Sequence, residues 1–249
     1  MAGHNKWSKV KHIKGAADAK RSQLFSKLSK EITIASRGGG DPDLNPRLRS
    51  AVTAARKQSM PSENIERAIK KGTGELGGEA IEEIVYEGYG PGGIAFLVEV
   101  ATDNKNRSAA DIRSLFNKNG GNMGSAGSVA YLFDRKGEIR VPLSALGEEA
   151  MLEAALEAGA DDVNGDGEDH VIHTTVETLF EVASALTKGG IESSSQKLVF
   201  VPKSTTCVGD AGITAGLVKL SAALDDYDDT QNVHSNFDLT DEVMAALDA

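Results

Sequence analysis

The sequence predicts a multidomain α+β protein: an N-terminal three-helix bundle followed by two α/β sheet domains, one of them ferredoxin-like and inserted in the other. Three observations lead to this prediction. Residues 1–75 are basic and show only helical periodicity, whereas residues 76–249 are acidic and contain strand-like segments. The acidic part also contains a βαββαβ order of elements, which is typical of the ferredoxin-like fold. A length of 249 residues allows two to three domains of this size.

Three short helices are expected in the basic part. Apolar residues at helical spacing predict the first over residues 17–37, and the glycines at 38–40 end it. Asn45 is a cap followed by Pro46 at the first helical position, so a second helix begins there. A third is expected over residues 61–72. Small and apolar residues on one face of each predict a compact bundle, and the short connection between the second and third also allows a helix-turn-helix.

The acidic part is expected to contain two sheets. For the first we expect strands at 81–86, 94–100 and 129–133, a helix at 104–119, and a last helix and strand at 210–225 and 231–236. The inserted unit is expected to consist of strands at 138–142, 161–164, 169–175 and 191–201 with helices at 146–158 and 176–188. The predicted domains are a flexible basic arm at 1–20, the helical domain at 21–78, an α/β domain at 79–135 plus 205–249, and the insertion at 136–204.

Charge is distributed unevenly along the chain. The formal net charge is -10, yet residues 1–75 hold 16 Lys/Arg and 7 Asp/Glu, a net of +9, so residues 76–249 have a net of -19. Such asymmetry indicates a polyanionic partner for the basic part, because Lys and Arg neutralise phosphates and release their counterions. The arm also holds Trp7, the single tryptophan, which is suited to stacking on an unpaired base. The predicted nucleic-acid-binding residues are Lys6, Trp7, Lys9, Lys11, His12, Lys14, Lys20, Arg21, Lys27, Arg47, Arg49, Arg56 and Lys57.

Other patterns are assigned to structure rather than chemistry. Residues 88–93, GYGPGG, match a dinucleotide-binding pattern but precede a strand, so we expect a strand–turn–strand connection. Residues 162–167 resemble the start of a calcium loop, but His173 stands where a Glu is required, so we expect a polar hairpin. The aspartates at 225–229 are expected to form a solvated acidic surface, of a kind suited to facing a basic partner, rather than a metal site. Asn104 is expected to cap a helix, with a polar functional loop at 103–107 as the alternative.

Several function classes receive no support. The single cysteine, Cys207, cannot form an internal disulfide or a cysteine-based zinc site, which fits a reducing, cytoplasmic location. No secretory signal or apolar run long enough to span a bilayer is visible, so no membrane partner is expected. No nucleotide-binding P-loop or nucleophile motif occurs, and the sequence therefore predicts a non-enzymatic protein without metal or cofactor.

Five motifs in order along the chain resemble the YebC/PmpR family. They are residues 1–7 (MAGHNKW), 39–49 (GGDPDLNPRLR), 60–69 (MPSENIERAI), 86–93 (YEGYGPGG) and 103–107 (DNKNR), with Asn5 where most members have Ser. The resemblance runs from end to end and implies a helical domain and two α/β domains, one inserted in the other. It adds a group of possible functional residues in two loops: Tyr86, Gly90, Asp103, Asn104, Asn106 and Arg107.

The resemblance implies a regulator of gene expression, in one of two settings. Family members are described as transcriptional regulators that bind promoter DNA. Others act in translation: one is the mitochondrial translational activator of cytochrome c oxidase subunit I, and bacterial relatives act at the ribosome on stalled proline-rich chains. The expected function is therefore a DNA-binding transcriptional regulator, with a ribosomal-RNA-binding translation factor as the alternative. The acidic body is expected to contact proteins, such as those of the ribosome.

Overall fold

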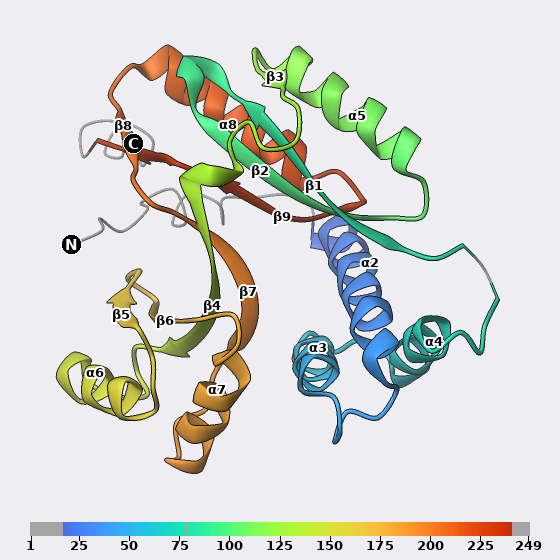
Figure 1. Ribbon diagram of the computed structural model, residues 1–249, viewed down its shortest axis with the longest axis vertical. Coiled ribbons are helices and arrows are strands. Elements are labelled where there is room, and N and C mark those ends of the chain that lie inside the picture. The colour runs from blue at the N-terminus through green and yellow to red at the C-terminus, as the bar shows by residue number, and fades with distance from the viewer. Residues whose placement is uncertain (1–16, 78, 241–249) are drawn as a thin grey trace.

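The structure is a computed structural model and describes residues 17–77 and 79–240. It confirms the predicted fold class: a three-helix bundle and two sheet units, one inserted in the other (Figure 1). In Figure 1 the bundle lies below one end of the first sheet, and the inserted unit lies below the other end. Within the described ranges, none of the helices combines the length and the apolar character needed to cross a membrane.

The bundle consists of α2 (Ala17–Ala35), α3 (Pro46–Lys57) and α4 (Ser62–Gly72), with a 3-10 turn, η1 (Ser36–Gly38), after α2. Its helices begin where the sequence predicts. Asn45 caps α3 by accepting a hydrogen bond from the Leu48 N–H (3.1 Å), which satisfies a donor that the first helical turn leaves free. Ile32, Leu48 and Ala55 are fully buried, so the bundle has an apolar core of its own.

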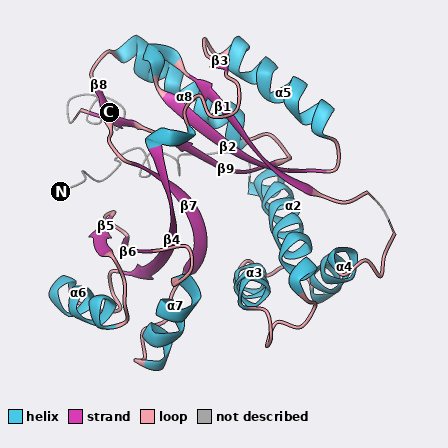
Figure 2. Ribbon diagram, in the orientation of Figure 1, coloured by secondary structure: helices cyan, strands magenta, loops and turns pink. Residues whose placement is uncertain are grey.

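The first sheet has the strand order β3-β1-β2-β9, and Figure 2 shows two helices lying against it. Its strands are β1 (Glu82–Tyr89), β2 (Ala95–Thr102), β3 (Asn122–Met123) and β9 (Thr230–Ser235), and its helices are α5 (Lys105–Lys118) and α8 (Ala211–Asp225). Both helices cover the same face, because Phe116 of α5 and Leu220 of α8 join Phe96 of β2 in one buried cluster. The residues at 88–93 form the predicted turn, with a 3-10 segment, η2 (Pro91–Gly93), between antiparallel β1 and β2.

The inserted unit is an antiparallel sheet of order β5-β6-β4-β7 with two helices. Its elements are β4 (Phe133–Pro142), α6 (Glu148–Glu157), β5 (Asp162–Gly165), β6 (Asp169–Thr174), α7 (Leu179–Lys188) and β7 (Ser195–Pro202). Numbered within the unit, the order is 2-3-1-4, which is the ferredoxin-like arrangement that the βαββαβ order predicts. The calcium-like segment is a hairpin, in which Asp166 accepts the N–H groups of Glu168 and Asp169.

The prediction of separate strands at 129–133 and 138–142 is wrong. A 3-10 turn, η3 (Ala130–Leu132), leads into the single continuous strand β4, so the predicted boundary at 135/136 lies inside a strand. Gly137 interrupts the apolar pattern because there is no room for a side chain: a Cβ there would collide with the Thr174 hydroxyl and lie 2.8 Å from the Leu179 Cβ. The short parallel pair β8 (Thr206–Val208) and β10 (Phe237–Leu239) was not predicted either. The domain boundaries themselves stay predictions.

Candidate nucleic-acid interface

The cations of α2 face an acidic segment of the same chain, residues 225–229, between α8 and β9. The Lys27 Nζ lies 3.4 Å from the Asp225 Oδ1, and the Lys30 Nζ lies 2.6 Å from the Asp229 Oδ1. The Lys30 Nζ also donates to the Asp228 carbonyl (2.8 Å). The basic partner of the acidic segment is thus α2, and Asp229, at 6% exposure, is not the solvated residue that we expected.

Asp229 is the centre of this contact. Its Oδ2 accepts hydrogen bonds from Arg107 (2.8 Å) and from the Thr102 hydroxyl (3.0 Å), both of which belong to the first sheet unit. Burial raises the pKa of the carboxyl, but the hydrogen bonds and charges of Lys30 and Arg107 outweigh it, so the pKa lies below its usual value. Arg107 in turn has a raised pKa, mainly because of its hydrogen bond to Asp229. The cluster therefore joins the bundle to the sheet through charged hydrogen bonds.

Apolar contacts strengthen the same junction. Ile34 of α2 packs with Ile81 and Ala101 in a buried cluster, and Arg37 donates a hydrogen bond to the Ile81 carbonyl. Gly72, the last residue of α4, passes so close to α2 that a Cβ would collide with the Thr33 carbonyl and the Ser36 hydroxyl. The bundle therefore docks on the sheet chiefly through α2, and α4 packs tightly on α2.

Three of the predicted α3 cations are engaged within the chain. The Arg47 guanidinium bonds the Glu31 Oε1 (2.9 Å) and the Glu83 Oε1 (2.8 Å). Burial lowers the pKa of Arg47, but these two carboxylates raise it above its ordinary value. Arg49 holds the preceding loop by donating to the carbonyls of residues 42 (2.9 Å) and 43 (2.6 Å), and Lys57 donates to the Ser193 carbonyl (2.7 Å) of the inserted unit.

Four exposed cations of the bundle have a different environment. Within residues 21–77 and 79–240, the side chains of Arg56, Arg67, Lys70 and Lys71 take part in no ion pair or hydrogen bond. Only Arg56 belongs to the predicted set. The other three lie on α4, and sequence reasoning did not select them because the absence of a partner depends on contacts between distant segments. Arg21, also predicted, stacks 5.4 Å from the ring centroid of Phe25.

The basic arm, residues 1–20, contributes seven of the predicted nucleic-acid-binding residues. Lys6, Trp7, Lys9, Lys11, His12 and Lys14 lie outside the described residues, as does the Lys20 side chain. Their assignment to nucleic-acid binding stays a prediction.

The two predicted functional loops have clear structural roles. Asn104 caps α5 by accepting the Arg107 N–H (3.1 Å), which confirms the capping interpretation. Tyr86 is buried, and its hydroxyl lies 3.0 Å from the Ser108 Oγ. Gly90 packs where a Cβ would lie 2.6 Å from the Phe96 ring. Asp103 pairs with Arg107 (3.0 Å) and Asn106 is exposed. A further role of these loops in function stays a prediction.

A separate carboxylate, which sequence reasoning did not single out, holds the loop that leads into η3. Glu87, 7% exposed, accepts the backbone N–H groups of Gly127 (2.6 Å), Val129 (2.7 Å) and Ala130 (2.8 Å). Burial raises its pKa, and these hydrogen bonds lower it below the usual value. Across the described residues, no group of three or more His, Cys, Asp or Glu side chains is arranged to hold a metal ion.

Comparison with known proteins identifies the family. Residues 5–75 match the model of the TACO1/YebC protein N-terminal domain, and residues 81–237 match that of the TACO1/YebC second and third domain. The chain belongs to the TACO1/YebC family. This confirms the resemblance seen in the five sequence motifs.

Full-length relatives of this TACO1/YebC chain carry the name probable transcriptional regulatory protein. One from Akkermansia muciniphila is 52% identical over 250 residues, covering 99% of this chain and 100% of the relative. One from Treponema denticola is 54% identical, covering 96% and 97%. The crystal structure of a conserved hypothetical protein from Aquifex aeolicus, 48% identical, superposes with a TM-score of 0.89 and covers 96% of this chain and 98% of that one.

Proposed function

We propose that this chain is a nucleic-acid-binding regulator of gene expression that acts on transcription by binding DNA. The observation that carries the proposal is the separation of charge: a basic front end, net +9 over residues 1–75, attached to a body of net -19. In the bundle, the exposed cations Arg56, Arg67, Lys70 and Lys71 have no counter-ion among the described residues. Exposed cations of this kind favour binding to phosphates, because their contact with a nucleic acid releases the counterions condensed on it. The name of the curated relatives supports the regulatory part of the proposal.

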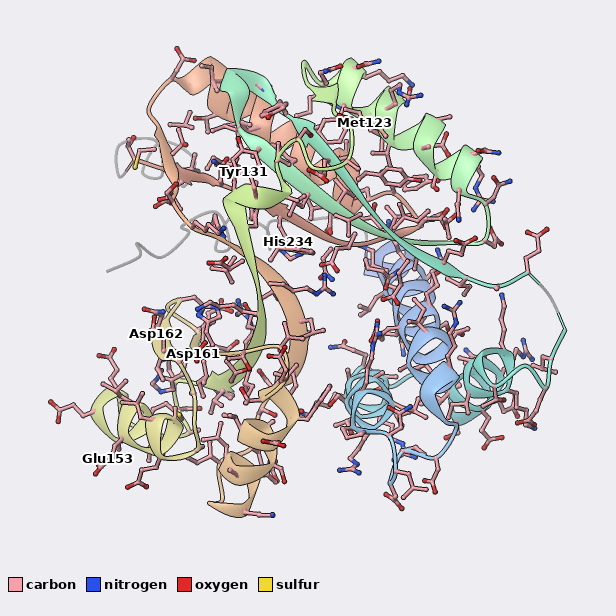
Figure 3. All side chains as sticks on the ribbon, viewed as in Figure 1. Met123, Tyr131, Glu153, Asp161, Asp162 and His234 are labelled. Atoms are coloured by element: carbon pink, nitrogen blue, oxygen red, sulfur yellow. The ribbon has the colours of Figure 1, made fainter. Side chains whose placement is uncertain are left out.

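The acidic body favours an oriented contact. Figure 3 shows Glu153, Asp161 and Asp162 on the inserted unit, at the far side of the molecule from the bundle. A polyanion is repelled by that side and attracted by the bundle, so it approaches the protein with the bundle as its first point of contact. The acidic side is then free for a protein partner with basic segments. The proposal assigns no catalytic step, cofactor or membrane contact to the chain.

Translation is the second candidate function, and the composition of the arm favours it. Trp7 stands among Lys6, Lys9 and Lys11 without an acidic neighbour, a combination that suits stacking on unpaired bases of structured RNA. A chain acting there binds ribosomal RNA and relieves stalling on proline-rich nascent chains, as the family resemblance implies.

Crosslinking in cells followed by sequencing of the bound DNA and RNA separates the two candidates. Enrichment of promoter DNA supports the transcriptional role. Recovery of ribosomal RNA without promoter enrichment refutes that role and supports translation. Both candidates predict that removal of residues 1–20 abolishes binding, and that charge reversal at Lys9, Lys11 and Lys14 lowers the salt slope of binding by roughly 2 to 3.

A further inference from the structure

A cavity of about 280 Å³ opens between α2 and α4, where the bundle meets the first sheet. Lys30 and Ser29 line it from α2, and Asn64, Arg67 and Lys71 line it from α4. The carboxylates of Asp103 and Asp229 contribute to the opposite wall. None of the α4 residues in this wall belongs to the predicted binding set, so the cavity is a feature that only the structure reveals.

Two cations of the cavity have no counter-ion among the described residues. Arg67 and Lys71 lie four residues apart, so they are neighbours on the same face of α4 and repel one another. Glu63 precedes Arg67 by four residues, the usual spacing for an ion pair, yet no Glu63–Arg67 pair forms. Neither cation makes a hydrogen bond or an ion pair within the described part of the chain. An anion placed between them relieves this repulsion.

The carboxylates of the wall are already neutralised. Asp229 accepts from Lys30 (2.6 Å) and Arg107 (2.8 Å), and Asp103 pairs with Arg107 (3.0 Å). Four cations, namely Lys30, Arg107, Arg67 and Lys71, therefore stand against two carboxylates. The excess of two positive charges lies on the α4 side, where Arg67 and Lys71 are exposed.

Uncharged donors complete the lining. Ser26, Ser29 and Asn64 line the cavity, and their side chains make no hydrogen bond within the described residues. Hydroxyl and amide groups beside a guanidinium and an ammonium donate the hydrogen bonds that phosphate oxygens accept. The volume is small for a drug-sized ligand but suits one phosphate group with its adjoining sugar or water.

We propose that this cavity binds a phosphate group of the nucleic-acid backbone, with Arg67 and Lys71 as its principal ligands. The proposal rests on the proposed function for the source of the phosphate, and it adds a defined phosphate site on α4 to the α3 contacts that the sequence predicts. It gives a role to the α4 cations, which have no partner among the described residues, whereas three α3 cations are engaged within the chain.

The test compares two double variants with the same change in net charge. Arg67→Glu with Lys71→Glu alters the cavity, and Arg113→Glu with Lys118→Glu alters two exposed α5 cations that also have no partner within the described residues. Binding of the full-length proteins to fluorescein-labelled RNA hairpins and DNA duplexes is followed by anisotropy over a series of salt concentrations. Circular dichroism verifies that each variant is folded, and inorganic phosphate is titrated calorimetrically into each protein at constant ionic strength.

We expect the cavity variant to bind nucleic acid at least tenfold more weakly than the α5 variant, with a salt slope lower than that of the α5 variant by about 1 to 2. Equal affinities and slopes for the two variants overturn the proposal while leaving nucleic-acid binding intact. If the affinities are equal but inorganic phosphate binds the wild type and not the cavity variant, the backbone source is wrong and free phosphate is the ligand. If the wild type binds neither RNA nor DNA, the proposed function itself fails.

Discussion

Replacement of Asp229 by Asn tests the contact that docks the bundle on the sheet. The carboxylate is 6% exposed and accepts from Lys30 (2.6 Å), Arg107 (2.8 Å) and Thr102 (3.0 Å), so three elements meet at one charge. Asn has nearly the same shape, but it removes the negative charge and turns an NH₂ group towards one of the two cations, since Lys30 bonds Oδ1 and Arg107 bonds Oδ2. The substitution therefore isolates the electrostatic part of the contact.

The magnitude follows from the two charged hydrogen bonds. Each contributes about 1.5–3 kcal/mol to stability when it is shielded from water. The Lys30 side chain is 17% exposed and retains most of this value, whereas Arg107 is 49% exposed and retains little because solvent screens it. The substitution weakens both hydrogen bonds and leaves the largely buried Lys30 ammonium without the carboxylate that neutralises it. Together these effects lower the free energy of unfolding by about 3 kcal/mol.

Urea denaturation followed by far-UV circular dichroism measures this change. Asp226→Asn is the matched control, because Asp226 is exposed and its carboxylate makes no hydrogen bond or ion pair within the described residues. We expect the control to lie within about 0.5 kcal/mol of the wild type. A D229N variant as stable as D226N would refute the assignment of Asp229 as the centre of the docking contact.

Acid provides a second readout of the same residue. The pKa of Asp229 is lower in the folded protein than in the unfolded chain, where it is about 3.9. Its stabilising effect is therefore complete above that unfolded value and is lost as the pH falls through the folded pKa. We expect the difference in unfolding free energy between the wild type and D229N to shrink below about pH 4. A difference that stays constant down to pH 2 would contradict a charge-based contact.

The remaining predictions concern local contacts and use thermal or urea unfolding. Gly72→Ala forces a methyl group against the Thr33 carbonyl and destabilises the protein by about 1–3 kcal/mol, whereas Gly77→Ala, with nothing within 4 Å, has no such effect. Equal midpoints for these two variants would contradict the close approach of α4 to α2. Glu87→Gln removes the charge that three backbone N–H groups share, and it lowers the free energy of unfolding by about 2 kcal/mol. Glu79→Gln, at an exposed position, is its control. An unchanged stability of the Glu87 variant would show that the loop does not depend on that charge. Asn45→Ala removes the α3 cap and costs about 1 kcal/mol, and no change would argue against the cap.

The helices of the bundle were predictable because their signals are local. These signals act within one or two helical turns: a proline after Asn45, a glycine at the helix end, and apolar residues at helical spacing. The ferredoxin-like order was predictable for a similar reason, since strand and helix segments of ordinary length alternate there. The continuity of β4 was not predictable, because Gly137 serves a contact with Thr174 and Leu179 that lie far along the chain.

The candidate interface was predictable only in part. The charge asymmetry is visible in the sequence, but the partners of individual cations are not. Lys27 and Lys30 meet aspartates about 200 residues away, which no periodicity indicates. As a result the sequence selected Lys27 and Arg47, which form ion pairs within the chain, and omitted Arg67 and Lys71, which form none within the described residues.

The affinity of the full-length chain for RNA and DNA over a series of salt concentrations tests the central claim most directly. Lys6, Lys9, Lys11 and Lys14 in the arm and Arg56, Arg67, Lys70 and Lys71 in the bundle are eight candidate phosphate contacts. We expect saturable binding whose log affinity falls linearly with log salt, with a slope of about -6 to -7 if all eight cations engage phosphates. Absence of saturable binding to either nucleic acid, or an affinity that does not change with salt, would contradict it.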